Sequence, residues 1–232
     1  IISSSYSGNT EETLNALNLA IKNNATIIAV TTGGKLLEIA KENGYDIVEV
    51  TPGFQPRAAL GFSMALNLLL LEKIELLPSK LMTNLLKNSF DKLNQFSIKL
   101  SDYTKSNPAI EFSKNIHDKF PVIYAGLGWK SNCALRLRGQ LAENAKILGS
   151  HLNFPEHNHN EIEGWKNNEN ILKHFVVIWI KDSSDHPRVK IRQLISGKIL
   201  KDIGIKQFFI EMDGESFQDR FLSMIHFGDW LS

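Results

Sequence analysis

The sequence predicts an α/β fold made of two doubly wound parallel-sheet halves joined by a helical connector. Two observations lead to this prediction. Short apolar strand patterns alternate with helical patterns in the first third of the chain and again after residue 118, which is typical of βαβ units. In addition, residues 176–180 are apolar without alternation, as expected for a strand that is buried on both faces of a sheet.

The first half contains alternating elements with apolar residues at strand or helix spacing. In order, we expect a strand end, a helix, a strand, a helix, a strand and a long apolar helix at residues 1–2, 11–23, 26–31, 35–43, 46–50 and 57–74. The break at Gly33-Gly34 separates the second strand from its helix. We assign residues 1–78 to a first domain.

The second half repeats this order after a different kind of segment. Residues 79–118 are polar and helix-forming, with Leu and Phe at wide spacing, and are predicted to be a helical connector. The elements expected after it alternate between strand and helix at residues 121–125, 130–144, 175–180, 189–200, 207–210 and 216 onward. Residues 119–232 therefore form the second predicted domain.

Bulk composition excludes several classes of protein. The net charge of +1 over 232 residues indicates neither a nucleic-acid surface nor a membrane surface. The single cysteine, Cys133, fits a reducing cytoplasm. The longest apolar run, Ala65 to Leu71, is too short to cross a bilayer. We expect a cytoplasmic protein, and the strand end at Ile1 and the uncapped last helix lead us to expect a fragment.

The segment from Ser4 to Thr13 is rich in hydroxyl groups and opens a helix directly after a strand end. Backbone N–H groups and hydroxyls gathered at the positive end of a helix dipole can bind a phosphate monoester. The alternative is an ordinary capping box, formed by Asn9 and Glu12. A cap requires one side chain, whereas several crowd together here, so both interpretations remain open at this point.

Two charged residues could take part in chemistry. Glu143 lies near the end of a predicted helix, where the dipole opposes a negative charge, and it is a candidate general base. The alternative is a solvated glutamate paired with Lys146 or Arg138. Arg57 opens an apolar helix, where a cation also opposes the dipole. It either stabilises an oxyanion or is simply exposed in the first turn.

The segment His157-Asn158-His159-Asn160-Glu161 has three interpretations. Two alternating imidazoles near a carboxylate could bind a divalent metal. Alternatively, neighbouring carboxamides could hold one imidazole in a single tautomer for acid–base work. Loop histidines that do neither are the most common case.

Together these motifs resemble a known family. Ser5-Tyr6-Ser7-Gly8-Asn9-Thr10 resembles the phosphosugar-binding loop of SIS (sugar isomerase) domains. The later motifs Pro56-Arg57, Glu143-Asn144-x-Lys146 and Pro155-Glu156-x-Asn158-His159-Asn160-Glu161 narrow the resemblance. The chain resembles, over essentially its whole length, the prokaryotic bifunctional phosphoglucose/phosphomannose isomerases, which contain two SIS domains.

The resemblance implies an aldose–ketose isomerase that acts on hexose 6-phosphates, works without a metal or cofactor and is a homodimer. By the matching motifs, the substrate phosphate is held by Ser5, Ser7 and Thr10. Arg57 corresponds to the arginine that stabilises the enediolate, and Glu143 to the base that moves the proton between C1 and C2. His159 corresponds to the ring-opening histidine, which reaches the site from the partner subunit. The helix over Ala65–Leu71 is a candidate for part of the dimer contact.

The chain also departs from the family pattern. A second glycine-rich phosphate-binding turn is expected before Ile1, and a segment linked to mannose acceptance is expected after Ser232; both are missing. We therefore expect little turnover from residues 1–232 alone. The rival hypotheses are a non-catalytic SIS-domain sensor, which would need neither Glu143 nor His159, and a metal-dependent isomerase.

Overall fold

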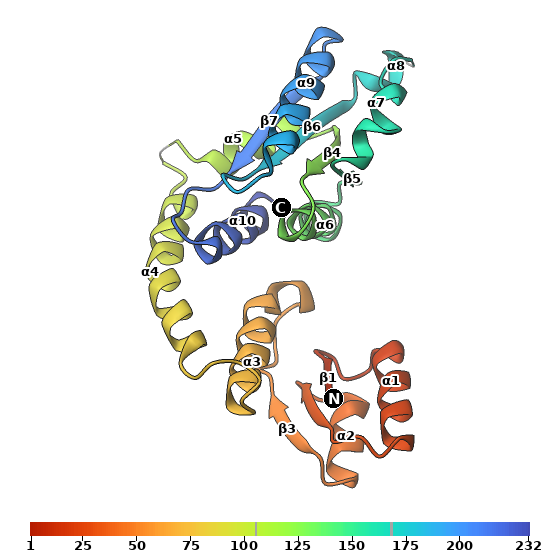
Figure 1. The fold of residues 1–232 in the computed structure, drawn as a ribbon, viewed down its shortest axis with the longest axis vertical. Coiled ribbons are helices and arrows are strands. Elements are labelled where there is room, and N and C mark those ends of the chain that lie inside the picture. Colours follow the sequence, from red (N-terminus) through yellow and green to blue (C-terminus); the bar gives the residue numbers. More distant parts are fainter. Residues whose placement is uncertain (105, 168) are drawn as a thin grey trace. The chain divides into compact units, whose positions relative to one another are not determined.

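The computed structural model describes residues 1–104, 106–167 and 169–232, and the chain divides into two compact units (Figure 1). The first unit is Ile1–Leu86 and the second is Lys87–Ser232. Each unit contains one parallel β-sheet and is described by itself. The boundary between them lies inside the segment that the sequence predicts as a connector, residues 79–118.

The first unit has three parallel strands in the order β1-β2-β3, with a helix between each strand and the next. Its elements are β1 Ile2–Ser5, α1 Glu11–Lys22, β2 Ile28–Thr31, α2 Gly34–Glu42, β3 Asp46–Glu49, the 3-10 turn η1 Pro56–Ala59 and α3 Leu60–Lys73. Parallel neighbours require such crossover helices. The predicted alternation of strands and helices is therefore present in this unit.

The core of the first unit lies between its sheet and its first two helices. Leu17 and Ala20 of α1 pack with Leu36 and Ala40 of α2 and with Ala29 of β2. The apolar helix α3 differs, because none of its side chains is fully buried in the unit. It therefore presents apolar surface that this core does not use.

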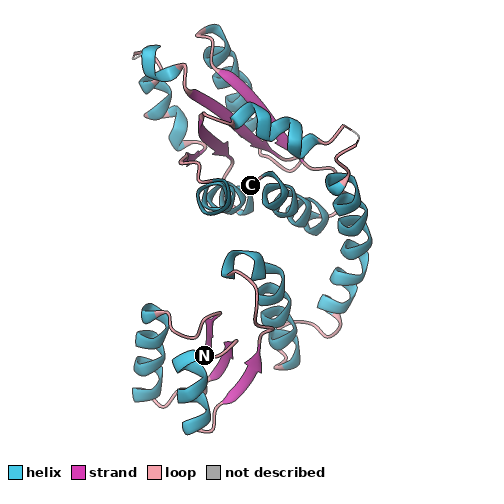
Figure 2. Ribbon diagram, turned by 180° about the vertical axis from the view of Figure 1, so that it is seen from behind, coloured by secondary structure: helices cyan, strands magenta, loops and turns pink. Residues whose placement is uncertain are grey.

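The second unit has four parallel strands in the order β5-β4-β6-β7, with helices on both faces (Figure 2). Its strands are β4 Phe120–Ala125, β5 Ser150–Asn153, β6 Phe175–Lys181 and β7 Lys206–Glu211. Helix α4 Leu81–Ser101 begins in the first unit and continues into the second. The other helices of the second unit are α5 Pro108–Ile116, α6 Trp129–Gln140, α7 Glu161–Gly164, α8 Glu169–Leu172, α9 Pro187–Asp202 and α10 Phe217–Leu231. Two short turns complete the list, the π-helical turn η2 Leu141–Ala145 and the 3-10 turn η3 Glu156–Asn158.

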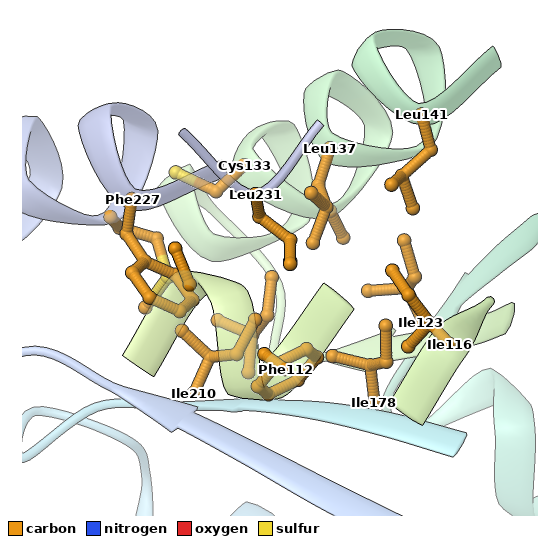
Figure 3. Packing of buried hydrophobic residues seen from close by; sticks show 14 of the residues in the cluster. Phe112, Ile116, Ile123, Cys133, Leu137, Leu141, Ile178, Ile210, Phe227 and Leu231 are labelled. Atoms are coloured by element: carbon orange, nitrogen blue, oxygen red, sulfur yellow. The ribbon is translucent and has the colours of Figure 1, made fainter. Parts of the chain in front are cut away.

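Strand β6 is buried on both faces, as the sequence predicts. Val176, Ile178 and Ile180 belong to one apolar cluster, which packs under α5, α6 and α10 (Figure 3). Val177 and Trp179 point to the opposite face and belong to the second cluster. Alternate side chains of a strand point to opposite faces, so an apolar run without alternation fills two cores at once.

Two features of this unit differ from the sequence-based expectation. The edge strand β5, Ser150–Asn153, was not predicted, because it is short and its residues are neither β-branched nor alternating. The second half of the predicted helical connector also packs into the core of the second unit. Leu100 at the end of α4 and Phe112 and Ile116 of α5 are buried in the main core of the second unit.

Among the described residues, no helix is both long enough and apolar enough to cross a membrane.

Candidate functional site

The segment from the end of β1 to the start of α1 carries the three hydroxyls that the sequence predicts as phosphate ligands, and two of them are in contact. Ser5 is buried, and its Oγ lies 2.8 Å from Thr10 Oγ1. The Gly8 N–H donates to Ser5 Oγ at 3.1 Å. Ser7 and Thr10 are exposed. Ser5 therefore braces the loop from inside, while the hydroxyls of Ser7 and Thr10 are accessible to a ligand.

The start of α1 is suited to bind an anion. Thr10 occupies the N-cap position, but its side chain accepts no hydrogen bond from the first turn of the helix. The first N–H groups of a helix lack partners within it and carry the positive end of its dipole, and phosphate oxygens are good acceptors for them. Glu11 and Glu12 lie in the same turn, but both are exposed, so solvent screens their charges.

The capping-box interpretation of Asn9 is wrong. Its side-chain Oδ1 accepts a hydrogen bond of 3.1 Å from the N–H of Lys35, which lies in the first turn of α2. Asn9 therefore satisfies a donor of the next helix rather than capping α1. This interaction joins residues 26 positions apart, so local sequence spacing could not reveal it.

Two glycines allow the loops after β1 and β2 to pack closely. Gly8 has φ +69°, and a Cβ there would lie 1.8 Å from the carbonyl oxygen of Gly33. Gly34 has φ +68°, and a Cβ there would lie 2.4 Å from the carbonyl oxygen of Ser7. Both the backbone conformation and the space require glycine. From the sequence, Gly33-Gly34 is predicted only as a break between elements, and local spacing does not reveal this packing role, although Thr31 and Thr32 before it resemble the serines of the first loop.

Arg57 lies in the same unit as this loop. It is half-buried in the 3-10 turn Pro56–Ala59, and α3 begins only at Leu60. The α-helix expected to start at Arg57 therefore starts later, so the guanidinium precedes the first helical turn. The chain approaches Arg57 through the exposed segment Thr51–Gln55.

Glu143 lies in the second unit, in a π-helical turn that continues α6 from Leu141 to Ala145. Such turns are rare overall, but where they occur they frequently lie at functional sites. Glu143 is exposed, and Lys146, with a left-handed φ of 59°, donates from Nζ to the main-chain carbonyl of Glu143 at 2.6 Å. The lysine thus supports the turn that presents Glu143 through a contact with its backbone.

Helix α10 braces the segment that carries Glu143. Arg136 of α6 donates to both carboxylate oxygens of Asp229, at 2.8 and 2.9 Å. Gln140 donates to the same carboxylate at 2.7 Å. At the end of the turn, Asn144 donates to Ser232 Oγ at 2.9 Å. Paired hydrogen bonds to a carboxylate fix orientation as well as distance, so the last turns of α6 are held against α10.

The two histidines of the predicted motif have opposite environments. His157 is fully buried, and its ring centroid lies 4.1 Å from that of Tyr124 and 5.1 Å from that of Phe154. Burial lowers the pKa of His157 to about 4, so its ring is neutral near pH 7. His159 is exposed. The pair therefore does not converge on one metal ion, and among the described residues no group of three or more His, Cys, Asp or Glu side chains could hold one.

The loop that carries His159 is anchored by its neighbours. Asn158 donates to Ser196 Oγ of α9 at 2.9 Å, and Asn160 donates to Glu156 Oε1 at 2.6 Å. Tyr124 donates to Glu161 Oε1 at 3.1 Å. Burial raises the pKa of Glu161, although this hydrogen bond partly offsets the effect. The asparagines thus hold the loop, while the imidazole of His159 is accessible to solvent.

The predicted residues fall into two groups. Ser5, Ser7 and Thr10 lie in the segment from the end of β1 to the start of α1 in the first unit. Arg57 belongs to the same unit but lies in η1. Glu143 and His159 both belong to the second unit, on η2 and directly after η3. The first unit therefore carries the residues predicted to bind phosphate, and the second carries the carboxylate and the imidazole that are candidates for proton transfer.

Comparison with known proteins gives consistent matches. Residues 105–232 match the family described as "Bacterial phospho-glucose isomerase C-terminal SIS domain". The chain is 39% identical over 98% of its length to the bifunctional phosphoglucose/phosphomannose isomerase of Aquifex aeolicus, of which it covers 67%. It is 36% identical over its full length to the protein of the same name from Caldicellulosiruptor bescii, of which it covers 68%.

A solved structure supports the fold. Tagatose-6-phosphate ketose/aldose isomerase from Escherichia coli matches 99% of the chain, which covers 66% of that structure, with a TM-score of 0.67 and 15% identity.

Proposed function

The chain belongs to the family of bifunctional phosphoglucose/phosphomannose isomerases and is an isomerase. From this premise we propose that it interconverts glucose 6-phosphate, and also mannose 6-phosphate, with fructose 6-phosphate. The reaction moves one proton between C1 and C2 through an enediolate. A second proton moves between the oxygen atoms on C1 and C2, and because the isomerisation neither adds nor removes electrons overall, no cofactor enters the balance.

The phosphate group is bound by the loop after β1. Thr10 and Ser7 donate their hydroxyls, the first N–H groups of α1 add the positive end of the helix dipole, and Ser5 holds Thr10 in place through the 2.8 Å contact between their hydroxyl oxygens. Because the phosphate is remote from the reacting carbons, its binding energy positions the substrate. This loop is the observation that carries the proposal, since its accessible hydroxyls lie at a helix start that the Thr10 side chain does not cap.

Glu143 and Arg57 carry out the proton transfer between C1 and C2, as base and as stabilising cation. Glu143 removes the proton from the carbon next to the carbonyl and returns it to the neighbouring carbon. A hydrogen α to a carbonyl is too weak an acid for a free carboxylate, so the developing charge on the enediolate oxygens must be stabilised by a fixed cation. Arg57 supplies this charge. Formation of both aldoses requires the intermediate to accept a proton on either face of C2, after rotation about the C2–C3 bond.

His159 opens the sugar ring by transferring a proton between the ring oxygen and the hydroxyl at the anomeric carbon. Its exposed position on an anchored loop suits a residue that serves the active site of a second subunit. The assembly is a homodimer, and the unburied apolar surface of α3 is a candidate for part of its contact. A sensor without catalysis would not need Glu143 and His159, and no observation favours that alternative.

The test is a coupled assay of the complete protein with fructose 6-phosphate, in which glucose 6-phosphate and mannose 6-phosphate are measured separately. We expect both products and no change when a chelator is added. Loss of activity with the chelator would instead support a metal-dependent isomerase. Binding of fructose 6-phosphate without either product would support a sensor.

A further inference from the structure

The phenol of Tyr6 bridges the proposed phosphate loop and the segment that leads to Arg57. Tyr6 lies between Ser5 and Ser7 in sequence, and its side chain reaches the loop after β3. Its hydroxyl donates to the carbonyl of Thr51 at 3.1 Å and accepts from the N–H of Phe54 at 3.0 Å. One oxygen atom therefore holds two main-chain groups, and both belong to the same short segment.

The backbone of Tyr6 is itself fixed. Its carbonyl oxygen accepts from the N–H of Thr32 at 3.1 Å and from the Thr32 hydroxyl at 2.6 Å. Ser5, the preceding residue, is buried in the loop and bonded to Thr10. Tyr6 thus extends from an anchored main chain, so its phenol can transmit the position of the phosphate loop to its partners.

The other end of the bridge lies close to Arg57 along the chain. Only Gln55 and Pro56 separate Phe54 from Arg57, and the Ala58 N–H donates to the Gln55 carbonyl at 2.8 Å to close the turn. Proline fixes its own φ, which limits the backbone freedom between the held N–H of Phe54 and the main chain of Arg57. The segment 51–55 is exposed, and the Phe54 ring packs against Phe62 of α3 with ring centroids 5.1 Å apart. The phenol adds two main-chain hydrogen bonds to this apolar contact, on a loop that would otherwise be held only weakly.

We propose that Tyr6 is a positioning residue, which holds Arg57 at a set distance from the bound phosphate by joining the loop of Ser7 and Thr10 to the segment 51–54. The inference rests on the proposed function, because it gives Arg57 and the phosphate loop their roles there. A phenol suits the task because its hydroxyl donates and accepts at the same time. Phenylalanine fills the same space but can do neither.

Arg57 must meet charge that develops only after the phosphate is bound, so an error in its placement affects the chemical step. Small misplacements of catalytic groups lower rates strongly. The positions of the groups that touch the phosphate are instead set by hydrogen bonds within the loop of Ser7 and Thr10. Loss of the Tyr6 hydroxyl should therefore lower kcat and leave phosphate affinity nearly unchanged.

The experiment compares Tyr6→Phe with the parent in the complete protein. We expect kcat to fall about 10-fold, while the inhibition constant of inorganic phosphate changes by less than about 2-fold. Tyr45→Phe is the matched control, because Tyr45 directly precedes β3, at the amino end of the parallel strands, and packs against the core of the same unit. It should leave both constants unchanged. Equal losses in kcat and in phosphate affinity would overturn the proposal.

A second variant shows whether Tyr6 acts through Arg57. In an Arg57→Lys background the cation remains but its planar fork is lost, so exact placement matters less. The Tyr6→Phe change should then cost about 2-fold or less, a departure from additivity that indicates coupling. An unchanged 10-fold cost would overturn the proposal. An inactive parent would count against the proposed function instead, so the two failures are distinguishable.

Discussion

Each unit contains a loop that leads from the carboxyl end of a parallel strand into a helix. The two loops differ in whether the polar groups at the start of the helix are accessible or are satisfied by side chains of the protein. In the first unit, Tyr6–Thr10 leads from β1 to α1, and its hydroxyls and helix start are accessible. In the second unit, Asp182–His186 leads from β6 to α9. There the His186 ring accepts from the N–H of Arg188 at 3.1 Å, so a side chain caps the helix.

The acidic side chains of the second loop are buried in ion pairs. Asp185 lies 2.6 Å from Lys130 Nζ, and both side chains are less than a tenth exposed. Asp182 accepts from Arg220 Nε at 2.7 Å. Gly126 makes room for this arrangement, since a Cβ there would lie 2.8 Å from Asp185 Oδ1.

The same strand–loop–helix arrangement therefore differs in what lies at the end of the strand, which is exposed hydroxyls in the first unit and buried ion pairs in the second. Crevices at the carboxyl ends of parallel strands are the usual ligand positions in such folds. In the first loop the exposed hydroxyls leave the start of α1 without a side-chain cap, as the proposed phosphate binding requires. In the second, a carboxylate of the chain itself meets the buried cation, and the loop becomes a structural brace.

The largest expected effect separates binding from chemistry. Glu143→Gln should lower turnover by about 10³-fold or more, since general-base catalysis contributes on this scale, while sugar-phosphate binding survives in the first unit. Glu163→Gln, at an exposed glutamate paired with Lys166, is the matched control and should be silent. Kinetics and calorimetric titration measure both quantities. Normal turnover in Glu143→Gln would show that the base is another residue.

The next effect concerns the stability that the buried ion pair of Asp185 and Lys130 provides. Asp185→Ala leaves Lys130 buried without its partner and should reduce the free energy of unfolding by about 3–5 kcal/mol. Adding Lys130→Met should recover most of the loss, because the unpaired charge is then gone. Ser7→Ala in the first unit should change stability by less than about 0.5 kcal/mol. Urea denaturation measures all three, and equal effects of Asp185→Ala and Ser7→Ala would contradict the contrast between the loops.

His159 should matter only for ring opening. His159→Ala should reduce turnover on cyclic substrate by about 100-fold, with a much smaller loss on an open-chain analogue. Kinetics on both substrates provide the comparison. Equal losses would remove the ring-opening role.

The neighbouring His157 should instead affect stability through pH. Its folded pKa of about 4 lies below the ordinary value of 6.5, so the unfolded chain binds the extra proton first as the pH falls. Stability should therefore decrease between pH 6.5 and 4, with a slope of up to about 1.4 kcal/mol per pH unit from this group.

The change His157→Phe preserves an aromatic ring beside Tyr124 and Phe154 and should remove this contribution to the dependence of stability on pH. Denaturation at a series of pH values measures it. His174→Gln, at an exposed position, should keep the parent slope. A parent slope that persists in His157→Phe would assign it to other groups.

The smallest effect lies in the phosphate loop itself. Thr10→Ala removes one of several donors and should raise KM about 10-fold, with a smaller change in kcat. Thr26→Ala, at the opposite end of the sheet, should change neither. A fall in kcat at constant KM would argue against a phosphate role for Thr10.

Local patterns in the sequence predicted the alternating fold and the hydroxyl-rich loop, because both depend on neighbouring residues. Long-range partners were not predictable in this way. Asn9 binds the N–H of Lys35 rather than capping its own helix, and Tyr6 reaches Thr51. His157 and His159 look equivalent in sequence, yet only His157 fits into the aromatic core. The short polar strand β5 had no pattern to reveal it.

The central claim is that this isomerase moves a proton through Glu143 rather than a hydride. The direct measurement is conversion of fructose 6-phosphate by the complete protein in D₂O, with the aldose products analysed for deuterium at C2. The proposed mechanism predicts deuterium at C2 in both aldoses, with or without chelator, and formation of both products about 10³-fold more slowly by Glu143→Gln. Products that carry no deuterium at C2 and that Glu143→Gln forms at the parent rate would contradict it.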